Sequence, residues 1–245
     1  MTIKKKQSTV VTRSFVAGPA FDGFRAPTFR FLMGLRQNNQ KGWFEENRAA
    51  YEKHYLAPAL AFIADFGPRL RKLSKTVNFV PKVNGSLFRV HRDVRFGKDK
   101  RPYKDHIDMW FWEGPDKSRS TPGFFLRLEP DRLLLGTGLY RFDKAQLQRY
   151  REAVVDGRKA RVLQKAIDAM TDGPYQLAPP QRKRVPRGFD AEHPFAHLLL
   201  HDGLTVSWRG KPPRTVRSSA FLQWCESHYR AMLPIERWLV KQLTP

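Results

Sequence analysis

The sequence is short of cysteine and has no long hydrophobic stretch, and each absence excludes a class of protein. The single cysteine, Cys225, excludes an internal disulfide framework and any zinc or iron–sulfur site built from several cysteines. The longest run without a charged residue extends from His54 to Ala64 and has 11 residues. Because a membrane-spanning helix needs about 20 apolar residues, we expect no transmembrane segment and no membrane partner.

Acidic residues are also scarce, so positive charge dominates the chain. Among 245 residues, 45 Lys and Arg face 23 Asp and Glu, which gives a formal net charge of +22. A surplus of this size attracts polyanions, because Lys and Arg release condensed counterions when they neutralise phosphates. It favours a nucleic acid or a phosphorylated ligand as partner, and the alternative is a solvated basic surface without a partner.

Apolar residues, by contrast, are plentiful enough to build a core. Hydrophobic residues make up 41% of the chain and aromatic residues 13%, which excludes wholesale disorder. Residues 1–20 carry Lys4 to Lys6 and Arg13 without an acid and lack periodicity, which predicts a flexible basic tail. No secretory signal is indicated, so we expect a cytoplasmic protein. Residues 21–245 are expected to form a single α+β domain.

Apolar spacing predicts helices at both ends of this domain and strands between them. Helical periodicity marks residues 28–38, 43–70 with a break at Pro58, 147–154, 162–170, 194–200 and 218–243. Short apolar runs bounded by Gly and Pro predict strands at residues 86–90, 107–112, 123–128, 132–135 and 204–208. Since strands do not alternate with helices, this order predicts an α+β fold with a central, mainly antiparallel sheet flanked by N-terminal and C-terminal helices.

Polar side chains are densest between residues 84 and 106. Acids stand beside bases at Arg92-Asp93 and Asp99-Lys100, which suggests that carboxylates orient some guanidinium groups and leave others for an anion. Arginine offers paired donors to a phosphate, lysine offers a point charge, and tyrosine offers a hydroxyl or a stacking face. The predicted phosphate-binding residues are Arg89, Arg92, Arg95, Lys100, Tyr103 and Lys104.

Three further residues are predicted to orient this site. Asp93 and Asp99 are surrounded by cations, so their pKa values should be depressed, which makes them poor proton acceptors but suits them to holding arginines. Asn47 falls on an apolar helical stripe, and we expect its buried amide to tie that helix to the arginine segment. The alternative for the whole segment is an internal salt-bridge network without a ligand.

Several motifs, in one order, resemble a known family. They are Phe21-Asp22-Gly23-Phe24, Phe31 to Leu35 with Asn38-Asn39, Trp43 to Arg48 with Tyr51, Gly85 to Arg89, Arg92 to Phe96, Asp99-Lys100, Pro102 to Lys104, and Gly136 to Tyr140. Over roughly residues 20–243 the chain thereby resembles the bacterial and fungal domain of unknown function 2461 family. The resemblance implies a shared fold, brings no established activity or cofactor, and concentrates in residues 89–104. The chain departs from the family pattern at His91, Arg101 and Phe142-Asp143, which argues against a direct role for these positions.

Other patterns are interpreted as structural. His193, His197 and His201 have the spacing of metal ligands on a helix, but Pro194 drives His193 out of the helix, so we predict no metal site. The run Gly136 to Gly138 is more typical of a bulge or tight turn than of a phosphate cradle. Walker-type and dinucleotide-binding glycine patterns are absent, and the sequence leaves any cofactor unknown.

Three functions stay open. The first is a binding protein that recognises the phosphate of a nucleic acid or nucleotide through residues 89–104, aided by the basic loop 181–187. The second is an enzyme of phosphoester or nucleotide chemistry in which the same arginines stabilise developing charge. The third is a structural or partner-binding module whose arginines are paired internally.

Overall fold

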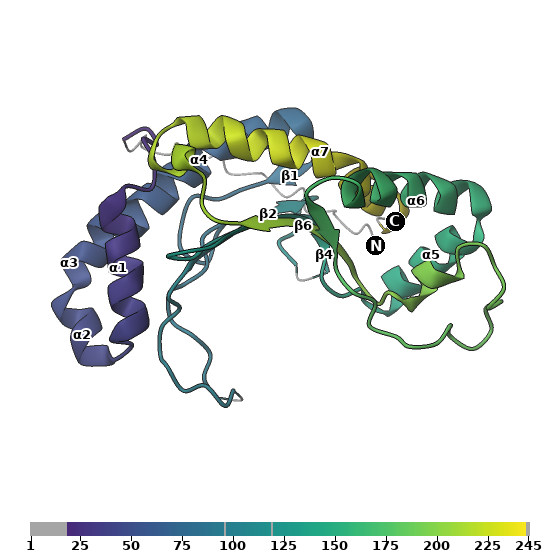
Figure 1. Cartoon of the computed structure of the whole chain (residues 1–245), viewed down its shortest axis with the longest axis horizontal. Coiled ribbons are helices and arrows are strands. Elements are labelled where there is room, and N and C mark those ends of the chain that lie inside the picture. The colour runs from purple at the N-terminus through teal and green to yellow at the C-terminus, as the bar shows by residue number, and fades with distance from the viewer. Residues whose placement is uncertain (1–18, 96, 119, 244–245) are drawn as a thin grey trace, which may run out of the picture.

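One antiparallel sheet lies at the centre of the protein (Figure 1). The computed structural model describes residues 19–95, 97–118 and 120–243, and residues 1–18 of the predicted basic tail lie outside this range. Within the described residues the sheet has six strands in the order β1-β2-β3-β4-β6-β5, each antiparallel to its neighbours. The strands are β1 (Val77–Asn78), β2 (Ile107–Glu113), β3 (Gly123–Leu128), β4 (Leu133–Leu139), β5 (Tyr175–Leu177) and β6 (Leu204–Gly210). The predicted α+β class is therefore confirmed.

The N-terminal helices form a hairpin-like arm at one end of the sheet and then run onto it (Figure 1). They are α1 (Ala26–Gln37), α2 (Lys41–Glu46), α3 (Arg48–Tyr51), the π-helical turn η1 (Glu52–Leu56) and α4 (Ala57–Leu73). The break predicted at Pro58 takes the form of an irregular turn just before it. The π-helical turn η1 leads directly into α4, and Pro58 in the first turn of α4 has no N–H to donate to the preceding helical turn.

The C-terminal half supplies the remaining helices. They are α5 (Lys144–Val155), α6 (Gly157–Thr171), the 3-10 turns η2 (Ala196–Leu200) and η3 (Arg214–Arg217), and α7 (Ala220–Leu243). Asp143 caps α5 as expected, since its carboxylate accepts from Gln146 N–H at 2.9 Å while Gln146 Oε1 accepts from Asp143 N–H. In the part of the chain that is described, no helix combines the length and apolarity needed to cross a membrane.

Strand alternation gives the sheet two different faces. Helices α4 and α7 cover one face, where Met109 and Phe111 of β2 are buried and Phe111 contacts Phe66 of α4. On the opposite face, Asp108 and Trp110 of the same strand are partly exposed. Because side chains alternate along a strand, the helix-covered face holds the core and the other face is the one that polar side chains can reach from solvent.

The strand predicted at residues 86–90 is wrong. In place of a strand, Leu87 forms isolated bridges to Met109 of β2 and to Val83. Two backbone hydrogen bonds join this short segment to β2, from Phe88 N–H to Asp108 O at 3.0 Å and from Trp110 N–H to Ser86 O at 2.9 Å. Asn84 adopts a positive φ of 62°, and the turn that follows uses the N–H groups of Ser86 and Leu87 to bind carbonyls at Val80 and Lys82. Because the N–H groups of Ser86 and Leu87 form hydrogen bonds within this turn, they cannot extend the pairing with β2 into a regular strand.

The Gly136 to Gly138 run is also not a turn, because it lies inside β4. A Cβ atom on Gly136 would come within 2.1 Å of the Phe125 ring, and one on Gly138 within 2.1 Å of the Leu204 carbonyl oxygen. The glycines therefore allow neighbouring strands and side chains to approach closely, and they do not form the phosphate cradle considered above.

A buried carboxyl group joins α7 to the sheet. Glu236 is fully enclosed, and Thr137 of β4 contacts both Glu236 Oε2 and, at 3.1 Å, the carbonyl oxygen of Gly123. A hydroxyl carries one proton, so both contacts are hydrogen bonds only when Glu236 is protonated and donates to Thr137. Burial, with a contribution from nearby Glu113, raises the pKa of Glu236 to about 8.

Replacing Glu236 tests this assignment. Because the folded-state pKa of about 8 lies above the ordinary 4.5, the stabilisation from the neutral acid is complete below pH 4.5 and is lost as pH rises toward 8. This loss costs on the order of 4 kcal/mol of unfolding free energy. Glu236→Gln should flatten that decline in denaturant titrations between pH 5 and about 8. A slope equal to that of the wild type would contradict a protonated Glu236.

Candidate anion-binding site

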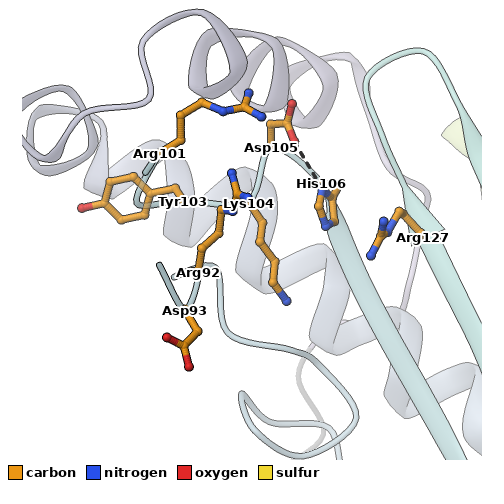
Figure 2. Close-up of a pocket in the computed structure, with 8 residues that line it drawn as sticks. All are labelled: Arg92, Asp93, Arg101, Tyr103, Lys104, Asp105, His106 and Arg127. Atoms are coloured by element: carbon orange, nitrogen blue, oxygen red, sulfur yellow. Dashed lines mark hydrogen bonds and ion pairs between the residues drawn. The ribbon is translucent and has the colours of Figure 1, made fainter. Parts of the chain in front are cut away.

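A cavity of about 320 Å³ opens where residues 89–104, the arginine loop, meet the sheet. The described part of this loop excludes residue 96. Side chains from the loop, from the two residues just before β2 and from the end of β3 form the wall (Figure 2). The lining residues are Arg92, Asp93, Arg101, Tyr103, Lys104, Asp105, His106 and Arg127.

Backbone hydrogen bonds close the arginine loop at its base. The N–H of Arg92 donates to Pro102 O, and the N–H of Lys104 donates to Val90 O, each at 2.8 Å. These bonds set the two ends of the loop side by side. Arg92 and Lys104, the residues at the closure, are thereby placed beside the start of β2.

The helical arm holds the loop through Asn39 and not through Asn47. Asn39 Nδ2 donates to Tyr103 O at 3.0 Å, and Asn39 Oδ1 accepts from Tyr103 N–H at 2.9 Å. The Asn47 amide instead donates to Trp43 O at 2.9 Å, within its own helix. The predicted tie through Asn47 is wrong because α2 ends at this residue, so its side chain satisfies the helix terminus.

Asp99 holds two arginines of the wall at once. Its carboxylate accepts from Arg101 Nη2 at 2.7 Å and from Arg92 Nη1 at 2.5 Å. Hydrogen bonds from Arg101 and then Arg92 lower the pKa of Asp99, which stays ionised. Asp99 therefore orients both guanidinium groups, which is the role that the sequence suggested for it.

A second shared carboxylate, Asp108, gathers three basic groups on the strand side. It accepts from Arg127 Nε at 2.7 Å and from Lys104 Nζ at 3.3 Å, and it lies 3.2 Å from His106 Nε2. On the other side of the imidazole, Asp105 Oδ1 lies 3.2 Å from His106 Nδ1. His106 is thus held between two carboxylates.

This arrangement stabilises the charged forms of His106, Asp105 and Asp108. Burial disfavours the imidazolium, but the bonds to Asp105 and Asp108 outweigh it and raise the pKa of His106. The bond from His106 lowers the pKa of Asp105. For Asp108, burial opposes ionisation, yet hydrogen bonds from His106 and Arg127 prevail and lower the pKa. Within this group, His106 is stabilised as a cation and Asp105 and Asp108 as anions.

The N-terminal helices support the cluster from behind. Tyr55, on the π-helical turn η1, donates its hydroxyl to His106 O at 3.0 Å. Arg36 of α1 donates to Asp105 at 2.7 Å and to Asp131 of the β3–β4 turn at 3.1 Å. The helical arm thus fixes both the backbone and the carboxylate next to His106.

The predicted ligand-binding residues divide into two groups of three. Those that line the cavity are Arg92, Tyr103 and Lys104. Those on the exposed outer part of the loop are Arg89, Arg95 and Lys100. In the outer group, Lys100 Nζ donates to Val94 O at 2.9 Å, and Arg95 donates to Asp93 at 2.8 Å. The carboxylate of Asp93 thus orients an arginine that lies outside the cavity wall.

Tyr103 contributes less to the cavity than the sequence suggested. Its side chain is only 3% exposed and stacks on Phe44 of α2, with ring centroids 4.2 Å apart and an interplanar angle of 15°. Figure 2 shows the ring directed away from Lys104 and His106. The aromatic face expected to meet a ligand is therefore covered by the protein.

Sequence reasoning missed the strand side of the cavity, and it set Arg101 aside although this residue lines the cavity. His106 and Asp108 alternate with the buried Ile107 and Met109, and this alternation in the sequence predicts that His106 and Asp108 share the sheet face opposite the core. Arg127 had no local signal, because only the pairing register places it opposite Asp108.

The histidines at positions 193, 197 and 201 do not form a metal centre with one another. His197 Nε2 lies 2.6 Å from Gln164 Oε1, and His193 Nδ1 accepts from Phe195 N–H. Among the residues that the structure describes, no group of three or more His, Cys, Asp or Glu side chains is placed to hold a metal ion.

The His106 cluster should make stability depend on pH. Because the folded-state pKa is raised, the contribution of His106 is complete below its ordinary value of 6.5 and is lost as pH rises through the folded-state pKa. His106→Gln should therefore lower the unfolding free energy more at pH 6 than at pH 9, measured by denaturant titration. His197→Gln, at an exposed histidine, serves as control. An equal loss at both pH values would show that His106 is not stabilised as a cation.

Comparison with known proteins agrees with this architecture. A search of curated proteins gives no match to the chain. A family model described as a conserved hypothetical protein, DUF2461, matches residues 27–238. The matched region contains the helical arm, the arginine loop, all six strands of the described sheet and most of α7. The chain therefore belongs to the DUF2461 family.

Proposed function

We propose that the cavity beside the arginine loop binds the phosphate group of an anionic ligand, a nucleic acid or a nucleotide. The observation that carries this proposal is the way in which cations share carboxylates. Four permanent cations of the wall share two carboxylates, since Arg92 and Arg101 pair with Asp99 while Lys104 and Arg127 pair with Asp108. The two carboxylates that line the wall themselves, Asp93 and Asp105, are paired with Arg95 and Arg36, which do not line it. A protonated His106 adds to this surplus. The cavity wall therefore favours an anion.

Unused donors point to the same conclusion. Arg92 uses only Nη1, Arg101 uses Nε and Nη2, and Arg127 uses Nε and Nη2 in side-chain hydrogen bonds within the described residues. Each guanidinium group therefore keeps at least one nitrogen for a ligand. Guanidinium donors held in place by carboxylates suit a phosphate, because little side-chain freedom is lost when it binds.

The purely structural alternative explains less of this arrangement. A network built only for stability would pair its charges and bury them, because an unpaired buried charge is costly. Here the side chains of Arg101 and Arg127 are 50% and 42% exposed. The enzyme alternative finds less support, because the carboxylates in the wall, Asp93 and Asp105, have lowered pKa values, and both ring nitrogens of His106 already contact carboxylates. Binding is the function that these groups support best.

Inorganic pyrophosphate provides a direct test by isothermal titration calorimetry at low salt. Arg101→Ala should weaken binding about tenfold, because it removes one charge-assisted hydrogen-bond donor. The variant should stay folded, since an exposed ion pair contributes little stability.

The matched control is Arg25→Ala. Arg25 also pairs with an aspartate in an exposed position, Asp22, at 2.8 Å, but it does not line the cavity. Its replacement should leave pyrophosphate binding unchanged. Equal effects of the Arg101 and Arg25 variants, or no binding by the wild type at millimolar pyrophosphate, would overturn the proposal.

A further inference from the structure

An exposed aromatic side chain stands directly beside the cavity. Phe88 is 42% exposed, and its backbone N–H donates to Asp108 O at 3.0 Å. The ammonium group of Lys104, a cavity residue, lies 4.9 Å from the centre of the Phe88 ring, and that of Lys117 lies 5.9 Å from it. Phe88 is thus an exposed ring flanked by two cations, one of which also faces the anion cavity.

The aromatic surface continues along the same face of the sheet. Trp110 lies two residues beyond Asp108 on β2, and its partner on β3 is Phe125, two residues before Arg127. Side chains two residues apart share a face and lie about 7 Å apart. Lys117 Nζ lies 5.9 Å from the Trp110 ring as well. Next to the Arg127–Asp108 pair there is therefore an aromatic pair with a cation above it.

Flat rings and fixed cations in one surface suit one chemical unit. An aromatic face alone would accept any flat apolar group, and a cationic cavity alone would accept any small anion. Together they match a base joined to a phosphate, because bases stack on aromatic side chains while the backbone follows positive charge. Arg89 and Lys98 of the arginine loop are also exposed cations and do not line the cavity, which suits the further phosphates of a chain.

We infer that the ligand is a single-stranded nucleic acid, with one phosphate in the cavity and a neighbouring base stacked on Phe88. This inference rests on the proposed function and deepens it. A duplex keeps the faces of its bases stacked inside the helix, so it cannot use Phe88. A free nucleotide meets the cavity and the ring but gains nothing from the outer cations.

Fluorescence anisotropy with a labelled oligothymidylate of about a dozen nucleotides, a length typical of such sites, tests the inference. Phe88→Ala should weaken binding about fivefold to tenfold, the effect of losing one stacked base. Phe88→Leu, which keeps apolar bulk but removes the ring, should show a similar loss. Tyr140→Ala, which removes an aromatic side chain that is 89% exposed but does not line the cavity, should bind like the wild type.

Competition distinguishes the kind of ligand. An unlabelled single strand should displace the probe at a concentration at least fivefold lower than a duplex of equal length or thymidine monophosphate. Equal competition by the duplex or by the mononucleotide would overturn the inference, and so would full affinity of both Phe88 variants. If Arg101→Ala weakens the oligonucleotide and the Phe88 variants do not, the phosphate cavity stands and only the stacking role is wrong. If neither pyrophosphate nor the oligonucleotide binds, the proposed function itself is wrong.

Discussion

The ionic contacts of Asp108 are the constraint on which the site depends. This carboxylate, on the sheet face opposite α4 and α7, is the common partner of Arg127 from β3, Lys104 from the arginine loop and His106 before β2. Two features of the fold bring basic groups to Asp108. The pairing register of β2 and β3 places Arg127 opposite it, and the hydrogen bonds that close the arginine loop bring Lys104 beside it. Without Asp108, three like charges would repel each other in a partly desolvated cavity, whose lower effective dielectric strengthens the repulsion.

The two faces of the sheet have different roles: one face holds the core that stabilises the fold, and the other carries residues of the candidate site. The face beneath α4 and α7 is packed with aliphatic and aromatic side chains, and its polar exceptions, such as Thr137 and Glu236, are linked to each other. The opposite face carries Asp108, Arg127 and Trp110, which are all partly exposed. Because alternate residues of one strand serve the two faces, the rigid core fixes the positions of the site residues.

The site also relies on supports that are far apart in the sequence. Arg36 and Tyr55 come from the helical arm, Asn39 holds the loop by its backbone, and Asp99 orients arginines from the distal part of the loop. These contacts hold the side chains before a ligand arrives, so binding need not pay to order them. Asp99 and Asp108 each pair with more than one basic residue, so the excess of Lys and Arg over Asp and Glu in the whole chain also holds within the site.

The sequence by itself determined the fold class, most helices, the four long strands and the segment in which charge is concentrated. Periodicity, capping residues such as Asp143 and a run of acids beside bases are local properties, and local properties can be read in one dimension. Only the tertiary structure decided which of those charged side chains contact one another. Arg127 joins the site through strand register, Asn39 replaces Asn47 because α2 ends at Asn47, and Tyr103 turns inward because Phe44 covers it. Residues 86–90 form only a bridge to β2, because the preceding turn uses the N–H groups of Ser86 and Leu87. Pairing across long sequence separations depends on how the elements pack, and the spacing of residues along the chain does not specify it.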